Sequence, residues 1–305
     1  MQMGNSLFRS RTSYSPLNLV LALLSLLSLA HFMNSCTSNP IGEDEISFGK
    51  RELKGEVRLA NNSNPEGVFV WLEGFDFDTT TDADGRFSFV LPPPAAQPGG
   101  GLSGGFTLYF YMANYELDSV AVFVQNGEFL YSTGDINSAG ELVLPRHLVQ
   151  ILNIRSSMFP ESVRREDTAN VFAKFQFSTS RSDTAFVYMP GVVNGFLNPI
   201  LFHNRDTGEI LIFSSTHAGL PVGDTLKVTN DGPVELIRVV TATTQDFPVG
   251  SYEAVPFLFV LQDGIPRELA NNIRVDMRAL SPDYLDIPFV RQRSLMTVLP
   301  AEAPN

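Results

Sequence analysis

The residues of this chain that could carry out chemistry are few and far apart. Its 305 residues include four histidines and one cysteine. His147, His203 and His217 are isolated from one another, whereas metal ligands recur at short, regular spacings. His203 and Asp206 fall in the segment HNRDTGE, whose composition predicts a solvent-facing hairpin turn. We therefore expect no metal ion and no cofactor in this chain.

Two short motifs match catalytic patterns but lack the context that catalysis needs. Gly101-Leu102-Ser103-Gly104-Gly105 matches G-x-S-x-G, which requires a strand before the serine and a helix after it. Here a Pro/Gly-rich loop precedes Ser103, and a predicted strand at residues 106–111 follows it. Ser47-Phe48-Gly49-Lys50 matches S-x-x-K but lies in a polar segment with no K-T-G motif downstream. We predict that the chain is not an enzyme.

Four acids near residue 80 could bind a hard cation: Asp76, Asp78, Asp82 and Asp84. In an EF-hand register with Gly85 at the sixth position, the twelfth position holds leucine instead of the required glutamate. Asp82 and Gly85 instead fit a hairpin turn, in which glycine supplies the left-handed backbone conformation. The turn is the prediction, and weak Ca²⁺ binding at these acids stays an alternative.

Trp71 is the only tryptophan and a candidate platform for a sugar ring. A tryptophan within a strand also serves as a core residue, because it buries a large apolar area. The exposure of the Trp71 side chain distinguishes the two interpretations. A solvent-exposed ring would favour glycan binding, and a buried ring would not.

Cys36 follows a segment typical of an export signal. Residues 1–18 contain two arginines and no acid, and Leu19–Ala30 is an apolar run of signal-peptide length. This run is shorter than the ~20 apolar residues of a transmembrane helix. Met33-Asn34-Ser35-Cys36 resembles the lipobox of bacterial lipoproteins, which implies cleavage before Cys36 and attachment of lipid, palmitate included, to that residue. Residues 1–35 are then a signal peptide, and residues 36–50 a lipidated polar tether.

The same resemblance implies a location in the cell envelope. An aspartate after the lipidated cysteine tends to retain such proteins in the inner membrane, and here that position is Thr37. We expect the outer membrane if the host is Gram-negative, on either its periplasmic or its surface face. The formal net charge of −12 and the absence of a basic cluster exclude nucleic acid as a partner.

Residues 51–145 alternate between apolar and polar positions, as half-buried strands do. The pattern is Gly55-x-Val57, Pro65-x-Gly67-Val68-x-Val70-x-Leu72, Thr81-Asp82-x-x-Gly85-x-Phe87-x-Phe89, Leu108-x-Phe110, Ala113-Asn114-Tyr115-Glu116 and Val120-x-Val122-x-Val124. It resembles the carboxypeptidase regulatory-like domain over residues 52–124. The resemblance implies a seven-stranded, transthyretin-like β-sandwich without catalytic residues. Residues 92–105 are an insertion relative to that pattern, and we expect them to form a mobile surface loop.

Residues 146–295 continue with short β patterns between turn signals, as β-sandwiches do. The predicted strands are Leu148–Arg155, Asn170–Phe177, Thr184–Met189, Glu209–Phe213, Thr225–Thr229, Val234–Val240, Glu253–Gln262 and Asn272–Arg278. The run Pro248-Val249-Gly250-Ser251-Tyr252-Glu253 is similar to late strands of immunoglobulin-like domains, which implies one such sandwich. Residues 296–305 are expected to be a frayed tail.

The fold expected from the sequence is all-β, with two β-sandwiches in tandem, transthyretin-like then immunoglobulin-like, after a lipoprotein signal peptide. The expected function is that of a non-enzymatic envelope lipoprotein, acting as a structural or protein-interaction module. The alternative is a carbohydrate-binding or adhesive surface module. The expected partners are the membrane, through lipid on Cys36, and an envelope protein or a glycan.

Overall fold

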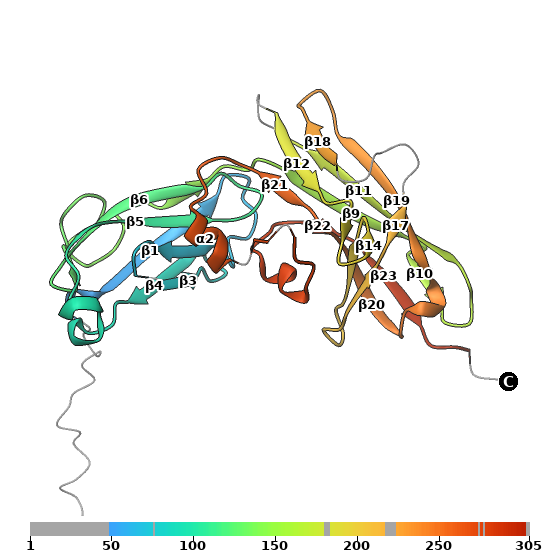
Figure 1. Cartoon of the computed structure of the whole chain (residues 1–305), viewed down its shortest axis with the longest axis horizontal. Coiled ribbons are helices and arrows are strands. Elements are labelled where there is room, and N and C mark those ends of the chain that lie inside the picture. The colour runs from blue at the N-terminus through green and yellow to red at the C-terminus, as the bar shows by residue number, and fades with distance from the viewer. Residues whose placement is uncertain are drawn as a thin grey trace, which may run out of the picture. The chain divides into compact units, whose positions relative to one another are not determined.

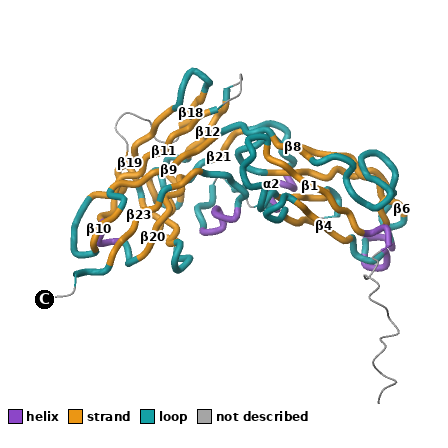
Figure 2. The backbone as a smooth tube through the Cα atoms, turned by 180° about the vertical axis from the view of Figure 1, so that it is seen from behind, coloured by secondary structure: helices purple, strands orange, loops and turns teal. Residues whose placement is uncertain are grey.

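The computed structural model describes residues 49–75, 77–179, 184–216, 224–273, 275–276 and 278–302. The described residues belong to one compact unit. The predicted signal peptide, Cys36, most of the tether, Asp76 and His217 lie outside them, as does Ser47 of the S-x-x-K motif. The described part is mostly β, as predicted, and its helices are short (Figure 2).

The first half contains two sheets (Figure 1). One has the order β4-β1-β8 and the other β3-β2-β5-β6-β7. The strands are β1 (Glu52–Leu59), β2 (Phe69–Leu72), β3 (Phe77–Thr80), β4 (Arg86–Val90), β5 (Gly104–Tyr111), β6 (Asp118–Gln125), β7 (Glu128–Phe129) and β8 (Arg146–Leu148). Strand β8 lies just beyond the predicted boundary at 145/146, yet it pairs in parallel with β1.

The first core lies between these two sheets and follows from the alternation of the strands. In β6, Val120, Val122 and Val124 are buried while the residues between them face outward. They meet Phe87 and Phe110 from β4 and β5, whose rings are 5.6 Å apart. The alternation that indicated strands in the sequence therefore places one face of each strand in this core.

Besides one two-stranded sheet, the described residues of the second half form two five-stranded sheets and a three-stranded one. Their orders are β10-β23-β20-β15-β16, β17-β19-β11-β9-β22 and β18-β12-β21. The strands are β9 (Asn153–Phe159), β10 (Ser162–Arg164), β11 (Asn170–Ser178), β12 (Ala185–Met189), β13 (Val192–Val193), β14 (Phe196–Leu197), β15 (Ile200–Asn204), β16 (Ile210–Phe213), β17 (Ser215–Thr216), β18 (Asp224–Val228), β19 (Val234–Thr243), β20 (Gly250–Pro256), β21 (Phe259–Leu261), β22 (Gln292–Arg293) and β23 (Leu295–Leu299).

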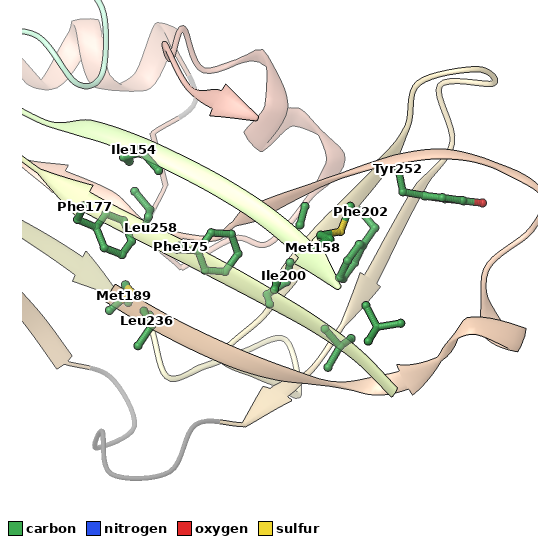
Figure 3. Packing of buried hydrophobic residues seen from close by; sticks show 14 of the residues in the cluster. Ile154, Met158, Phe175, Phe177, Met189, Ile200, Phe202, Leu236, Tyr252 and Leu258 are labelled. Atoms are coloured by element: carbon green, nitrogen blue, oxygen red, sulfur yellow. The ribbon is translucent and has the colours of Figure 1, made fainter. Parts of the chain in front are cut away.

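The second core gathers apolar side chains from all three of these sheets. Figure 3 shows Met158, Phe175 and Ile200, from β9, β11 and β15, directed into the same space. Edge-to-face contacts extend this core, because the ring of Phe247 lies 5.0 Å from Phe202 and 5.2 Å from Tyr252. Sheets packed face to face around such a core are consistent with β-sandwich domains.

The chain after β21 differs from the sequence-based expectation in two places. The strand predicted at 272–278 is wrong, because α2 (Arg267–Asn272) occupies its start and no strand is found in its described residues. Its apolar residue Ile273 is nevertheless buried, directly after α2. The frayed tail expected from residue 296 is also wrong at its start, because Met296 and Val298 are buried in β23. Strand β23 pairs with both β20 and β10.

Helical structure in the described part of the chain comprises α2 and short 3₁₀ helices. These are Gly49–Arg51, Pro94–Ala96, Pro98–Gly100, Thr244–Asp246 and Pro282–Asp286. Among the described residues, no helix is long and apolar enough to cross a membrane.

Candidate functional site

A third core, here called the junction core, contains residues of both halves. Strand β2 supplies Val70 to the first core and Trp71 to the junction core, because successive side chains point to opposite faces. Strand β15 likewise supplies Phe202 to the second core and Leu201 to the junction core. Sheets of both halves are therefore buried on both faces at this place.

Trp71 is buried in the junction core, with only 2% of its surface exposed. Its ring stacks on Tyr109 at 5.7 Å between ring centroids, with an interplanar angle of 26°. The interpretation of Trp71 as an exposed platform for a sugar is therefore wrong. The ring buries a large apolar area between the two halves instead.

Two buried tyrosines, Tyr111 and Tyr284, also belong to the junction core. Tyr284 is buried, and its hydroxyl accepts a hydrogen bond from the Leu258 amide at 3.0 Å and lies 2.7 Å from the Leu258 carbonyl oxygen, to which it donates. Burial raises the pKa of Tyr284. Burial also raises the pKa of Tyr111, and Tyr284 adds to that shift. Both phenols therefore stay neutral, as buried hydrogen-bonding groups do.

Asn114 holds the two halves together by hydrogen bonds. Its side-chain amide donates to the carbonyl oxygens of Leu152 at 2.9 Å and Val290 at 2.8 Å. Its side-chain oxygen accepts from the Val290 amide at 3.1 Å, and its backbone oxygen accepts from the Ile151 amide at 2.9 Å. Asn114 is completely buried, so these bonds satisfy groups that water cannot reach.

A pocket of about 440 Å³ opens beside the junction core. We call it the junction pocket. Its polar or aromatic lining residues include Glu66, Phe69, Thr80, His203, Arg205, Glu253, Asp286, Phe289, Arg291 and Arg293. The pocket is lined by both halves of the chain, and its volume falls within the ~300–1,000 Å³ typical of ligand pockets. It is therefore a candidate for a small-molecule site, although a pocket of about 600 Å³ in the first half is larger.

Glu253 is the buried carboxylate of the junction pocket. It lies in β20 opposite His203 of β15, and its side chain is only 3% exposed. Its Oε2 lies 2.9 Å from Nη1 of Arg293 and 3.9 Å from Nη1 of Arg205. Two guanidinium groups thus already compensate the charge that burial would otherwise penalise.

Arg291 lies against an aromatic ring instead of a carboxylate. It is half-buried, and its guanidinium carbon lies 4.8 Å from the centroid of the Phe289 ring. Burial lowers the pKa of Arg291, while Tyr284 and Glu253 raise it. Among the described acids, none lies within the 4.0 Å of an ion pair with Arg291. The pocket therefore contains one guanidinium without a described carboxylate in direct contact.

His203 lies at the edge of the junction pocket and not in the turn predicted for it. It is the fourth residue of β15, half-buried, and the turn itself follows at residues 205–208. Its Nδ1 lies 3.1 Å from Nη1 of Arg205. Burial lowers the pKa of His203, and Arg205 lowers it further. Its ring is thus predominantly neutral at pH 7. Asp206 lies in the predicted turn and accepts a hydrogen bond from the Ser251 amide.

Of the four acids near residue 80, Asp82 and Asp84 take part in turn structure. Asp82 accepts hydrogen bonds from the Asp84 amide at 3.0 Å and the Arg86 amide at 2.8 Å. Gly85 has φ +78°, and a side chain there would meet the Val57 carbonyl oxygen. No group of three or more metal-ligating side chains is found among the described residues, which exclude Asp76. Asp78 is exposed in β3.

The G-x-S-x-G match has no elbow geometry. Ser103 is exposed, and β5 begins at the next residue where a nucleophile elbow would need a helix. The Ser103 hydroxyl accepts a hydrogen bond from the Asn126 amide at 2.8 Å. His147 is exposed in β8 and distant in sequence from any second histidine.

The inserted segment 92–105 is organised around a buried glutamine, which the sequence interpretation missed. Gln97 donates to the carbonyl oxygens of Pro92 at 2.7 Å and Gly127 at 2.9 Å, and accepts from the Leu102 amide at 3.2 Å. Gln97 is 5% exposed. A side chain at Gly127 would collide with it, so glycine permits this contact.

A second surface feature is an exposed apolar row across one sheet of the second half. Phe159 of β9, Phe172 of β11 and Val239 of β19 are consecutive partners in the strand register. They lie on the face opposite the second core, which receives Met158, Ala173 and Val240. Phe159 is 68% exposed and Val239 38%, while Phe172 between them is half-buried. Contiguous exposed apolar side chains are typical of interaction surfaces.

Comparison with known proteins gives distant structural similarity only. No protein-family model and no curated protein matches the chain. A Bacteroides uniformis protein thought to bind carbohydrate has a TM-score of 0.30 and 9% identity, over 67% of this chain and 87% of its own. The major pilin subunit of Bacillus cereus has a TM-score of 0.24 and 13% identity, over 67% and 63% of the two chains. The Bacillus anthracis TIE protein has a TM-score of 0.21 and 10% identity, over 70% and 48%. TM-scores this low leave the function to be argued from the residues of this chain.

Proposed function

We propose that the chain is a non-enzymatic lipoprotein of the cell envelope, anchored by lipid on Cys36, which acts as a structural and protein-interaction module. In this proposal the first half is a transthyretin-like sandwich and the second an immunoglobulin-like one. The exposed row of Phe159, Phe172 and Val239 carries the proposal. Aromatic and aliphatic side chains on an exposed sheet face supply the apolar area that protein interfaces bury.

The junction core supports the structural part of this role. Side chains of both halves are buried there together, and Asn114 adds buried hydrogen bonds across the same boundary. A body held in this way keeps its binding surface at a fixed orientation. A rigid surface loses less conformational entropy on binding than a jointed one.

Capture of the full lipidated protein from gently solubilised envelopes tests the protein-interaction role. A stoichiometric partner is expected with the wild type and with Leu144→Ser, and not with the double variant Phe159→Ser, Val239→Ser. Leu144 is a matched control because it is 71% exposed and lies outside the apolar row. Capture that is equal for all three proteins would reject this surface.

Fatty-acid labelling tests the anchor separately. The wild type is expected to incorporate label and to fractionate with membranes, and Cys36→Ala to do neither. Membrane attachment of Cys36→Ala, together with an unlabelled wild type, would reject the lipoprotein assignment.

Carbohydrate binding is the second candidate function, and the junction pocket is the observation that favours it. The pocket offers charged and hydrogen-bonding groups around a cavity of about 440 Å³. Binding of oligosaccharides to the full protein, measured by calorimetry, tests this candidate independently of the apolar row.

A further inference from the structure

We infer that the junction pocket binds a saccharide bearing a carboxylate group, with Arg291 as the residue that pairs with the carboxylate. The inference rests on the second candidate function, carbohydrate binding, and adds the chemical class of the ligand. It follows from the charges of the pocket that are already compensated and from Arg291, which no described carboxylate contacts as an ion pair.

The negative charge of Glu253 is already balanced by neighbouring cations. This buried carboxylate has Arg293 at 2.9 Å and Arg205 at 3.9 Å, so two cations serve one anion. Arg291, which lines the same pocket, has no described acid within ion-pair distance. A half-buried guanidinium has lost part of its hydration, and a carboxylate would replace that hydration with two parallel hydrogen bonds.

The ring of Phe289 constrains the orientation of the Arg291 guanidinium. Its guanidinium carbon lies 4.8 Å from the centroid of the Phe289 ring. This contact limits the positions that the group can adopt and leaves its N–H edges for a ligand. A planar donor that is fixed before binding favours a planar, bidentate acceptor, which a carboxylate is and a hydroxyl is not.

The acids that line the pocket favour an acidic saccharide over a simple anion. Three acids, Glu66, Asp286 and Glu253, line the same pocket as the three arginines. The pocket as a whole therefore carries little net charge, which gives no advantage to a small, highly charged ion. Glu66 is exposed, so its oxygens can accept hydrogen bonds from ligand hydroxyls. A ligand with one carboxylate and several hydroxyls uses both sets of groups.

The closing experiment is calorimetric titration of the full, detergent-solubilised protein with digalacturonate, with the neutral disaccharide galactobiose and with sulfate. Digalacturonate is expected to bind at least tenfold more tightly than galactobiose. Arg291→Met is expected to remove at least tenfold of the digalacturonate affinity, and Arg291→Lys less. Arg155→Met, at an exposed position in β9, is the control and should bind like the wild type.

Three results would overturn the inference, and they differ in what they leave standing. Equal binding of the acidic and neutral disaccharides would remove the carboxylate requirement but keep carbohydrate binding. Sulfate that competes as well as digalacturonate would make the pocket a general anion site. No binding of either disaccharide would remove carbohydrate binding together with the inference. The comparison of ligands uses the wild type, so it does not depend on the folding of any variant.

Discussion

Asn114 and Val290 form two reciprocal hydrogen bonds across 176 positions of the sequence. The Asn114 amide nitrogen donates to the Val290 carbonyl oxygen at 2.8 Å, and the Val290 amide donates to the Asn114 side-chain oxygen at 3.1 Å. A side-chain amide thus takes the role of a strand partner for the returning chain. The Asn114 side chain also donates to the Leu152 carbonyl oxygen, so Asn114 connects three segments of the chain.

Replacement of Asn114 by alanine is expected to lower the free energy of unfolding by about 2–4 kcal/mol, because it leaves buried backbone groups of Leu152 and Val290 without partners. Urea unfolding followed by circular dichroism measures this loss. Asn64→Ala is the control, because Asn64 is exposed and its side chain hydrogen-bonds with the nearby Glu66. Its loss is expected to stay below about 1 kcal/mol. Similar values for both variants would contradict the role of Asn114.

Trp71 provides a fluorescence test of the junction core. As the only tryptophan, it reports a single environment. Because its ring is buried, we expect blue-shifted native emission that moves to longer wavelength on unfolding. Because the junction core joins both halves, this transition should coincide with the loss of β-sheet circular dichroism. Two separate transitions would show that the halves unfold independently.

Met296 tests the observed position of the C-terminal strand. Met296→Ala is expected to cost about 2–5 kcal/mol, since it opens a cavity in the second core. A chain truncated after Pro300 should lose far less, because the described residues beyond it are exposed. Thermal unfolding of the two proteins measures the difference. A stable Met296→Ala protein would instead support the frayed tail.

His203 predicts a pH dependence of stability. Its folded pKa is lowered, by burial first and then by Arg205. At pH values just below 6.5 the unfolded chain therefore binds a proton that the folded chain does not. Stability should fall as the pH drops through this range, and His203→Gln should lack this part of the fall. Urea unfolding at pH 7.5 and 5.5 compares the two proteins. An equal loss in both would exclude a contribution from His203.

The alternating strands were the part of the fold that the sequence could predict. Val120, Val122 and Val124 show the period of two directly, and Asp82 with Gly85 gives the turn chemistry. Predicted strands at 170–177 and 234–240 correspond to β11 and β19 within a few residues. These features depend on neighbours in the sequence, so a single sequence contains them.

The junction pocket was not predicted, because its residues come from segments far apart in the chain. His203 was assigned to a turn from its neighbours alone, and nothing local to Arg291 or Glu253 distinguishes them from other charged residues. One signal was available. The runs Phe69–Leu72 and Leu108–Tyr111 are apolar without interruption, which indicates strands buried on both faces rather than one. That pattern could have placed Trp71 in a core.

The junction core also limits how this gene could be divided or recombined. A segment encoding only the first half would expose Trp71, Tyr109 and Tyr111 on one side of its sheet. The second half alone would expose Leu201, Val255 and Phe257. Transfer of either half into another gene would require new polar residues on that face, because water would otherwise meet a surface built for burial. The two halves are therefore expected to be inherited as a pair.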